Sequence, residues 1–403
     1  MRLGIVGGRL QGVEAAYLAA KAGLEVVVLD RCRDVPAVEL AHEFHELDAT
    51  DGSNISRELL GGCDVILPAC ENVETLEGLV HWSSELDVPL AFDMEAYRTT
   101  ASKNASNRLF DSLAILRPAS WPACDYPVIV KPDAESGSHG VTLARDDLEL
   151  EEALAALRRQ GKDPVVQQFV SGDCLSVEVL GFHGRALPFQ VTQLEFDATY
   201  DCKRVVAPAE LEPVVQHALR DAGRMLAGEL DLNGIMDVEV MVDQSGLAVI
   251  EIDARLPSQT PSVVFHSTGV NLVEQLVEAT VGRAPQEWQP DGSRRGVVYQ
   301  HFAVEGTVGA IVGEARLGAG RPLRLVSGFF GCQEALTDYF PGSRSWVATL
   351  ITTGRDATQA REAGIHCLRA IARHCEVDRI IDDGPSPLAH TEKIRRSTRT
   401  DGV

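Results

Sequence analysis

The sequence lacks the features that define several classes of protein. No run approaches the roughly 18 consecutive apolar residues that a membrane-spanning helix requires. Residues 1–7 enter a short strand pattern without the apolar core or cleavage site of a secretory signal. None of the nine cysteines forms a C-x-x-C pair, which argues against zinc ribbons and thioredoxin-type redox sites. We therefore expect a cytoplasmic protein with reduced thiols and no membrane partner.

Basic residues are scarce, because 37 Lys and Arg stand against 59 Asp and Glu, for a formal charge of −22. Duplex nucleic acid and anionic membranes both demand dense positive charge, so neither is expected as a partner. A solvated acidic surface is the usual origin of such a charge, and cationic small substrates or bound divalent metals are the alternative. The length of 403 residues predicts two or three domains.

Residues 1–98 alternate strand and helix patterns. An apolar strand over 3–6 runs into a glycine turn at 7–12, and apolar residues then recur at helical spacing over 13–24. Further strands are expected over 25–29, 64–67 and 89–92. This alternation predicts an N-terminal, doubly wound parallel-sheet domain.

The glycine turn fits a dinucleotide-binding fingerprint only in part. Gly7 and Gly12 match G-x-G-x-x-G, but Arg9 occupies the middle position, where only glycine lets a pyrophosphate approach the backbone. Asp30 ends the second strand, where a ribose-binding acid would stand. An NAD-dependent dehydrogenase is one alternative and a plain strand-to-helix turn is another. Arg9 could also contact a phosphate as a point charge.

From about residue 99 the pattern changes to strands joined by glycine loops, which predicts a second domain over 99–295 with a lid subdomain at about 125–185. Its expected elements are strands over 126–131, 141–144, 165–170 and 175–180 and helices over 211–229 and 272–281. A β-rich region is expected over 296–382, and a flexible polar tail over 383–403.

Two lysines and a glycine-rich loop indicate phosphate binding. The sequence contains no G-x-x-x-x-G-K-[ST] motif. Instead, Lys131 ends an apolar strand and the loop 133–140 follows it. Such a loop can fold over phosphates and donate backbone N–H groups, and Lys103 offers a second cation. A plain hairpin loop with surface lysines is the alternative reading of these residues.

Acidic residues alternate with apolar ones in two strands, 235–242 and 249–255. Because successive side chains of a strand face opposite sides, the polar residues of each strand share a face; they are Asp237, Glu239, Glu251, Asp253 and Arg255. A three-residue loop over 244–246 would pair Asp243 with Leu247 and place Glu239 opposite Glu251. A loop longer or shorter by one residue would put the two on opposite faces.

Four carboxylates on one surface require cations nearby, because two like charges 4 Å apart repel by about 4 kcal/mol at an effective dielectric of 20. Hard Mg²⁺ takes oxygen ligands and usually shares them with substrate phosphates. A solvated hairpin face without a ligand is the alternative, and a non-catalytic nucleotide- or metal-binding module is a further one.

The order of lysine, glycine lid, strand and acidic hairpin resembles the ATP-grasp superfamily of carboxylate–amine ligases. Within it the sequence is most similar to the pyrrolysine-biosynthesis ligases, through residues 7–12, 68–72, 199–202, 234–239 and 249–261. The resemblance covers residues 1 to about 285. It implies an α/β and α+β protein in which an N-terminal doubly wound parallel-sheet domain precedes an ATP-grasp fold and a C-terminal β-rich region.

The same resemblance implies a reaction and its cofactors, ATP and two Mg²⁺ ions. The carboxylate of (3R)-3-methyl-D-ornithine would be phosphorylated, and the ε-amine of L-lysine would attack the acyl phosphate to form an isopeptide. Another ATP-grasp ligase acting on amino acids is the nearest alternative. The oligomeric state stays open, with a homodimer among the alternatives.

The resemblance also implies roles for individual residues. Arg255 would stabilise the acyl phosphate as the catalytic residue. The ATP-binding residues would be Arg9, Asp30, Asp48, Lys103, Lys131, Ser138, Gln167, Gln168, Phe169 and Val170, and the metal ligands Glu239, Glu251 and Asp253. Lysine would be bound by Leu10, Gln11 and Glu71. The ornithine site would contain Ser176, Val177, Glu178, Asp237, Arg255, Ser258, Gln259 and Thr260.

Three positions depart from the family pattern. Arg9 replaces a lysine, and Gln167 and Gln168 replace the usual acidic residues, although backbone groups that read adenine do not depend on that change. Cys174 stands where relatives often place a ribose-binding Glu. The segment 200–202 matches the family pattern but has no assigned role.

Overall fold

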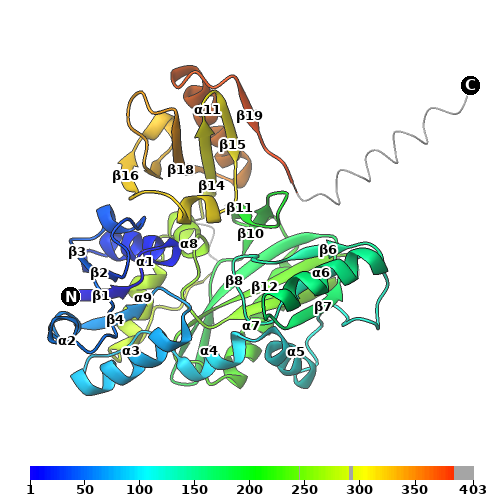
Figure 1. The fold of residues 1–403 in the computed structure, drawn as a ribbon, viewed down its shortest axis with the longest axis horizontal. Helices are drawn as coiled ribbons and strands as arrows, with labels where there is room; N and C mark the ends of the chain where they lie inside the picture. The colour runs from blue at the N-terminus through cyan, green and yellow to red at the C-terminus, as the bar shows by residue number, and fades with distance from the viewer. Residues whose placement is uncertain (245, 290–293, 385–403) are drawn as a thin grey trace, which may run out of the picture.

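The computed structural model describes residues 1–244, 246–289 and 294–384. Figure 1 shows a parallel-sheet domain in blue, a large green domain beside it, and a C-terminal region in yellow to red above both. The expected tail over 383–403 lies outside the described residues from position 385 onward. Within the described ranges, no helix has both the length and the hydrophobicity that crossing a membrane would require.

The first domain contains the predicted parallel sheet, which has four strands in the order β3-β2-β1-β4 and includes β3, a strand that was not predicted. The strands are β1 (Arg2–Val6), β2 (Glu25–Asp30), β3 (Glu43–Glu46) and β4 (Val65–Pro68), and the helices are α1 (Leu10–Lys21), α2 (Asn54–Gly61) and α3 (Val73–Leu86). Alternate residues pack on opposite faces: Leu3 and Ile5 join the core with α1, whereas Val6 joins the core with α2 and α3.

The strand expected over 89–92 is wrong. Only Leu90 pairs with the sheet, through an isolated parallel bridge to Ile66. The chain then turns into α4 (Met94–Thr100), whose first N–H groups bond to the side chain of Asp93. This N-cap ends extended backbone at that point.

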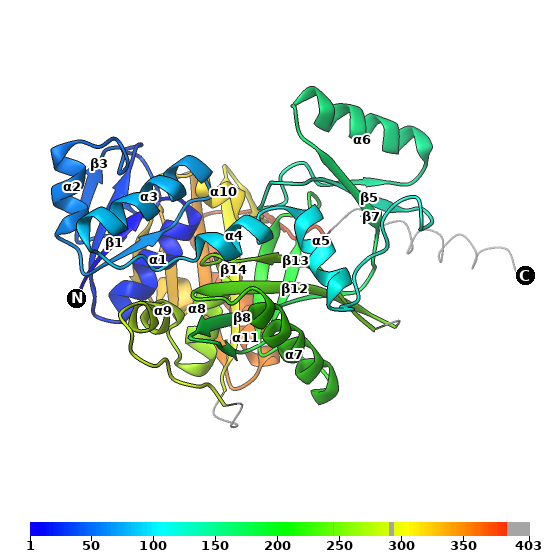
Figure 2. The same cartoon turned by 90° about the horizontal axis from the view of Figure 1, so that it is seen from below.

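The lid is a three-stranded antiparallel sheet in the order β6-β5-β7, with a helix packed on it. It comprises β5 (Val128–Pro132), β6 (Thr142–Ala144), α6 (Asp147–Arg159) and β7 (Pro164–Gln168). Figure 2 shows it standing to one side of the main body, near α5 (Lys103–Ser112). The loop 133–140 connects β5 to β6, so the lid carries the glycine-rich segment.

The second domain and the C-terminal region share one twelve-stranded sheet, with the main order β13-β12-β8-β10-β11-β14-β18-β17-β16. Its strands up to residue 253 are β8 (Asp173–Phe182), β9 (Arg185–Pro188), β10 (Thr192–Phe196), β11 (Cys202–Ala207), β12 (Ile235–Asp243) and β13 (Gly246–Asp253). The C-terminal strands are β14 (Gly296–Glu305), β15 (Val308–Ile311), β16 (Arg324–Ser327), β17 (Glu334–Thr337), β18 (Ser345–Gly354) and β19 (Arg379–Ile381). Because β11 pairs with β14, the sheet continues across residue 296.

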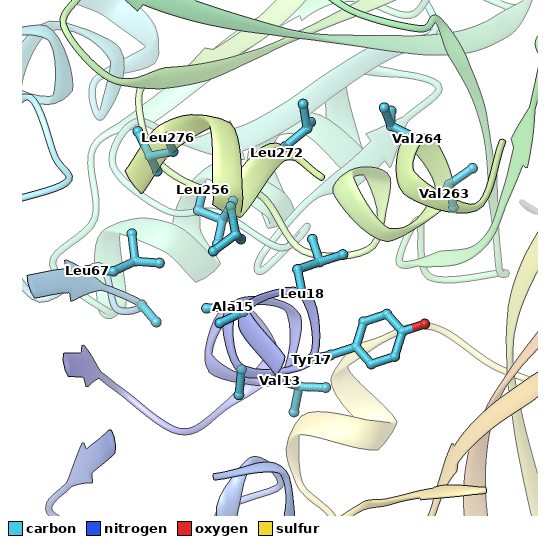
Figure 3. Packing of buried hydrophobic residues seen from close by; sticks show 14 of the residues in the cluster. Val13, Ala15, Tyr17, Leu18, Leu67, Leu256, Val263, Val264, Leu272 and Leu276 are labelled. Atoms are coloured by element: carbon cyan, nitrogen blue, oxygen red, sulfur yellow. The ribbon is translucent and has the colours of Figure 1, made fainter. Parts of the chain in front are cut away.

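Helices cover this sheet and join it to the first domain. They are α7 (Pro213–Glu229), α8 (Thr260–Thr268), α9 (Leu272–Thr280), α10 (Ala315–Gly318) and α11 (Ala357–His374). The α11 helix lies within the region expected to be β-rich. Figure 3 shows α1 beneath α8 and α9, with Leu18 between them and Leu256 and Leu272 in the same core. This packing fixes the start of α8, and therefore the cleft residues before it, relative to the first domain.

Candidate active site

The acidic hairpin lines a cleft because of strand alternation. In β12, Met236, Val238 and Val240 pack on the α7 side of the sheet, so Asp237 and Glu239 face the other side. The residues that line the cleft come from the lid, the central sheet and the C-terminal region; they are Ser136, Gly137, Ser138, Leu194, Phe196, Asp201, Cys202, Val205, Asp237, Glu239, Glu251, Asp253, Arg255, Pro257, Ser258, Gln259, Thr260 and Glu314.

The predicted pairing of Glu239 with Glu251 is confirmed, but the predicted loop is wrong. Asp243 pairs with Gly246 rather than Leu247, so the connection is one residue shorter than expected. The register shifts between Glu239 and Val240, which leaves an extra residue in β13 and restores the pairing. A β-bulge therefore cancels the effect of the shorter turn. Ser245, within that turn, lies outside the described residues.

Two lysines neutralise the acidic pair from the side of the lid. The Lys103 ammonium lies 2.9 Å from a carboxylate oxygen of Glu251. The buried Lys131 donates to the carbonyl of Ile250 at 3.2 Å, and burial lowers its pKa. Burial alone would raise the pKa of Glu251, but Lys103 and Lys131 outweigh it and the pKa lies below its usual range. The Glu251 carboxylate is therefore held ionised by these two cations.

The other carboxylates of the hairpin titrate at higher pH. Burial, reinforced by Glu251, raises the pKa of Glu239 to about 7. Burial also raises the pKa of Asp253 to about 6, against the opposing effect of Arg255, and raises that of Asp237 well above its usual range. In all three groups burial is the largest cause of the raised pKa, because it disfavours the charged form of a carboxyl group.

The donor set fits a magnesium ion that is shared with phosphate rather than enclosed by protein. Among the described residues, no group of three or more His, Cys, Asp or Glu side chains has the arrangement of a metal site. Glu239 and Glu251 are cross-strand partners, and buried oxygens of Asp237 and Asp253 have no hydrogen-bond partner in the described chain. Mg²⁺ commonly binds through one or two carboxylates, with phosphates and water completing the shell.

Glu71, in the loop after β4, meets three parts of the molecule at the cleft. Its carboxylate lies 2.7 Å from Nε of Arg255 and accepts a hydrogen bond of 2.7 Å from Gln11. The hydroxyl of Ser136 in the lid also donates to it. Arg255 lies 2.9 Å from Asp253 as well; both contacts are ion pairs by distance, without hydrogen-bond geometry at Nε. Glu71 thus joins the first domain, the lid and the hairpin.

Two further lid segments have defined contacts. Ser138 donates to the carbonyl of Tyr200 at 2.6 Å. The backbone amide of Gln168 donates to the carbonyl of Ala119 at 2.8 Å, and that of Phe169 donates to the carbonyl of Pro127 at 3.1 Å. Gln167 is buried. Within the described chain, the amide of Val170 has no protein acceptor.

The segment Arg255–Thr260, here called the strap, follows β13 and closes one side of the cleft. Ser258 and Gln259 donate to one oxygen of Glu314, at 2.6 and 2.8 Å. Gln259 has φ +70°, a left-handed conformation that is unfavourable for a residue with a side chain. Side-chain oxygens of Gln259 and Thr260 are buried without partners, which leaves them available to a ligand.

The neighbouring strand β8 contributes a buried acid. Ser176 donates to Glu178 at 3.3 Å, the other Glu178 oxygen is unpartnered, and burial raises the pKa of Glu178 to about 7. Val177 packs in the core on the α7 side, so its side chain faces away from the cleft. Only its backbone is available to a ligand there.

Nine of the 24 predicted site residues line this cleft, and four of the other fifteen are residues of the first domain whose described contacts lie elsewhere. Asp30 accepts from the amide of Gly8 at 2.7 Å, and Asp48 pairs with Arg31 at 3.3 Å. Arg9 is exposed at the start of α1, and Leu10 packs near Gly318. All four belong to the first domain and lie outside the set of cleft-lining residues.

Sequence reasoning missed Glu314 and gave Asp201 and Cys202 no role. All three line the cleft, and Glu314 reaches it from the C-terminal region, where no site residue was predicted. Burial, with Glu314 nearby, raises the pKa of Asp201 to about 7. The signal for Asp201 and Cys202 lay in the segment 200–202, which matches the family pattern, whereas no predicted motif contained Glu314.

Comparison with known proteins identifies a matching domain model and related sequences. The family model of the ATP-grasp domain matches residues 101–259, which include the lid, both lysines and the acidic hairpin. The 3-methyl-D-ornithine–L-lysine ligase of Methanosarcina mazei is 34% identical over 357 residues, covering 88% of this chain and 91% of the relative. This chain belongs to the 3-methyl-D-ornithine–L-lysine ligase family. The predicted family is therefore confirmed.

Two solved structures share the fold of this chain. The biotin carboxylase domain of Hydrogenobacter thermophilus 2-oxoglutarate carboxylase, solved with MgADP, has a TM-score of 0.71 at 16% identity, over 91% of this chain and 89% of that one. An L-amino acid ligase from Bacillus licheniformis has a TM-score of 0.64 at 16% identity, over 91% and 97% of the two chains. The predicted fold class is confirmed.

Proposed function

We propose that this protein joins the carboxylate of (3R)-3-methyl-D-ornithine to the ε-amine of L-lysine, with ATP converted to ADP and phosphate. The observation that carries the proposal is one cleft in which Glu239, Glu251 and Asp253 meet Lys103, Lys131 and Arg255. Such a cleft suits phosphoryl transfer, where catalysis is mostly positioning and charge stabilisation. The family relationship supports the identities of the two amino acids.

The nucleotide would bind between the lid and the central sheet. Lys103 and Lys131 lie where they can contact its phosphates, and the unpaired amide of Val170 can donate to the adenine. Ser138 and the loop 133–140 would cover the phosphates from above. Arg9, Asp30 and Asp48 lie outside the cleft, so their proposed nucleotide contacts rest on family resemblance alone.

Glu239, Glu251 and Asp253 would hold Mg²⁺, and we propose two ions. Bound Mg²⁺ would supply charge neutralisation for the transferred phosphoryl group. The related biotin carboxylase domain was solved with MgADP, which is consistent with this use of the hairpin. Asp237 would remain on the substrate side, next to Glu178 of β8.

The acid substrate would lie between Glu178 and the strap, with its ammonium groups near Glu178 and Asp237 and its carboxylate toward Arg255. Arg255 is partly buried and stays charged, so it can stabilise the acyl phosphate and the intermediate formed when the amine attacks. Lysine would approach from the first domain, where Glu71, Gln11 and Leu10 would receive its α-amino and apolar parts.

ADP release tests the proposal directly. We expect release to require both L-lysine and a D-ornithine-type acid, with an isopeptide found by mass spectrometry. Release that is indifferent to both amino acids would contradict it. Turnover with other amino-acid pairs would instead support a different ligase, an alternative favoured by the fold shared with the Bacillus L-amino acid ligase. One methyl group changes affinity by only about 1–3 kcal/mol, so methylornithine and D-ornithine must be compared quantitatively.

The variant Glu251→Gln tests the hairpin. It removes the charge that pairs with Lys103 while keeping the side-chain volume. We expect ADP release to fall by at least about 100-fold, because a charged group that acts on the transferring phosphoryl is lost. Glu229→Gln, an exposed position at the end of α7, is the control and should retain wild-type turnover. An unchanged rate for Glu251→Gln would overturn the metal assignment of this residue.

A further inference from the structure

The loop Asp197–Asp201 overlaps the segment 200–202, to which the family resemblance assigns no role. Its conformation is held by hydrogen bonds within the loop. One oxygen of Asp197 accepts from the amide of Thr199 at 2.7 Å and from that of Asp201 at 3.2 Å. Tyr200 between them has φ +66°, a left-handed conformation. A loop that holds a large residue in such a conformation is over-determined by its contacts, which is typical of functional segments.

This loop fixes the backbone on which Glu314 stands. Three consecutive amides, those of Gly313, Glu314 and Ala315, donate to this loop and to Cys202, which follows it. Their acceptors are a side-chain oxygen of Asp197 at 3.1 Å, the carbonyl of Cys202 at 3.1 Å and a side-chain oxygen of Asp201 at 3.0 Å. The backbone at Glu314 is therefore held at three successive positions.

Glu314 in turn holds the strap. One of its oxygens accepts from both Ser258 and Gln259, and Gln259 is the residue with φ +70°. An unfavourable backbone conformation persists only where neighbouring contacts impose it. The contacts form one chain from Asp201 through Glu314 to the two strap residues.

We propose that Asp201 is a positioning residue for the ligase reaction: it fixes Glu314 so that Glu314 holds Ser258 and Gln259 in the conformation that receives the acid substrate. The inference rests on the proposed function, because the strap is assigned there to the acid substrate. Asp201 itself acts through Glu314 and the strap.

A substitution at Gly313 would disturb the contact between Asp201 and the turn that carries Glu314 without changing Asp201 itself. A Cβ atom at position 313 would lie 2.1 Å from the Asp201 carboxylate, far closer than any non-bonded contact permits. Alanine there must displace either the carboxylate or the turn that carries Glu314. Gly313→Ala and Asp201→Ala should therefore have the same effect, although one adds atoms and the other removes them.

The experiment compares Asp201→Ala, Asp201→Asn and Gly313→Ala with the wild type. We expect the KM for the D-ornithine-type acid to rise roughly tenfold in Asp201→Ala and Gly313→Ala, as loss of one hydrogen bond to a carboxylate predicts. The Kd for ATP and the KM for lysine should stay within about twofold. Asp201→Asn keeps an oxygen that accepts from Ala315, so it should restore most of the KM.

Hydrogen exchange gives a readout that needs no activity. Amides of residues 256–263 should exchange faster in Asp201→Ala and Gly313→Ala without substrates, and at the wild-type rate in Asp201→Asn. Two controls should match the wild type: Gly228→Ala, where no atom lies within 4 Å of the new Cβ, and Asp221→Ala, which removes an exposed acid of α7.

The outcomes separate this inference from the proposed function. If the wild type releases no ADP with the two amino acids, the proposed function fails, while exchange in the strap still tests the positioning role. An unchanged acid KM with unchanged strap exchange overturns the role of Asp201, even if kcat falls. An equal loss of ATP affinity also overturns it, because the loop would then serve the lid through Ser138. Should Asp201→Ala fail to fold, Gly313→Ala decides.

Discussion

At the scale of single residues, the protonation of the cleft depends on where each carboxylate lies relative to the cations. Glu251 is buried, yet Lys103 and Lys131 keep its pKa low. Its cross-strand partner Glu239 has weaker cationic support, and burial raises its pKa to about 7. The pKa values of two acids on the same face of the same hairpin thus differ, because the lysines approach from one side only.

Arg255 makes the first residue-scale prediction. Arg255→Lys keeps a positive charge but loses the planar guanidinium whose Nε lies near both Glu71 and Asp253. We expect kcat for ADP release to fall about 100-fold, with the Kd for ATP changed less than about threefold. Arg98→Lys, in an exposed pair on α4, is the matched control. Equal losses in kcat and ATP affinity would argue against a role in the transition state.

Glu14 makes a prediction about pH. This buried residue of α1 accepts from the amide of Ser262 at 2.5 Å, and burial raises its pKa from 4.5 to about 8. The folded state therefore binds a proton that the unfolded state releases between these values. Stability should fall as pH rises from about 4.5 to 8, by up to about 1.4 kcal/mol per unit from this group.

The variant Glu14→Gln isolates that contribution. Its amide oxygen can still accept from Ser262 but does not titrate. We expect the free energy of unfolding, measured in urea at several pH values, to decline less steeply with pH than in the wild type. Parallel pH profiles for the two proteins would contradict the assignment.

At the scale of elements, the hairpin and the lid are both held by contacts that sequence spacing does not encode. The bulge in β13 sets which residues face the cleft, and the short turn alone would have reversed them. The lid meets the rest of the molecule through Ser136, Ser138 and Lys103, the last donating to the carbonyl of Glu135. The partners of these contacts belong to three different parts of the chain, and together they hold the lid in position.

Ser136→Ala tests the lid contact with Glu71. Loss of this hydrogen bond should raise amide exchange over residues 133–140 by roughly three- to tenfold without nucleotide, since a single net hydrogen bond contributes about 1 kcal/mol. Added ATP should restore protection. Ser112→Ala, an exposed hydroxyl on α5, serves as the control. Exchange equal to that of the wild type would show that Ser136 does not hold the lid.

At the scale of the whole molecule, a buried polar cluster joins the three regions. Tyr17 of α1 donates to Glu334 of β17 at 2.6 Å and lies 2.7 Å from His266 of α8. Lys21 pairs with the same Glu334 at 2.6 Å. Burial lowers the pKa of His266 to about 4, so it is neutral near pH 7. The cluster fixes the first domain against both the start of α8 and the C-terminal sheet.

Tyr17→Phe should destabilise the whole protein. It removes the hydroxyl between Glu334 and His266, and both partners remain largely buried, which costs about 1–3 kcal/mol. Tyr126→Phe, whose hydroxyl meets Asp147 at the lid surface, should cost less than about 1 kcal/mol. Chemical denaturation measures both. A Tyr17→Phe penalty no larger than that of Tyr126→Phe would mean that the cluster does not hold the regions together.

Much of this architecture could be predicted because it depends on local patterns. Period-two alternation placed Asp237 and Glu239 on one face, and the strand–helix alternation of residues 1–98 predicted a parallel sheet. The strand expected over 89–92 failed because Asp93 caps a helix there, a signal that competes with apolar composition. The three-residue loop failed because a bulge elsewhere in the strand also sets the register.

By itself, the sequence determined the family and its chemistry. It also determined which side chains of a strand share a face, since all of these depend on residue types and spacing along the chain. Only the tertiary structure decided which cations meet which carboxylates. It also brought Glu71 to Arg255 and Glu314 to the strap. These partners are far apart in the sequence and meet through the sheet that runs across residue 296 and the packing of α1 against α8. The burial and the pKa values of the cleft residues follow from this arrangement, because both depend on neighbours in space.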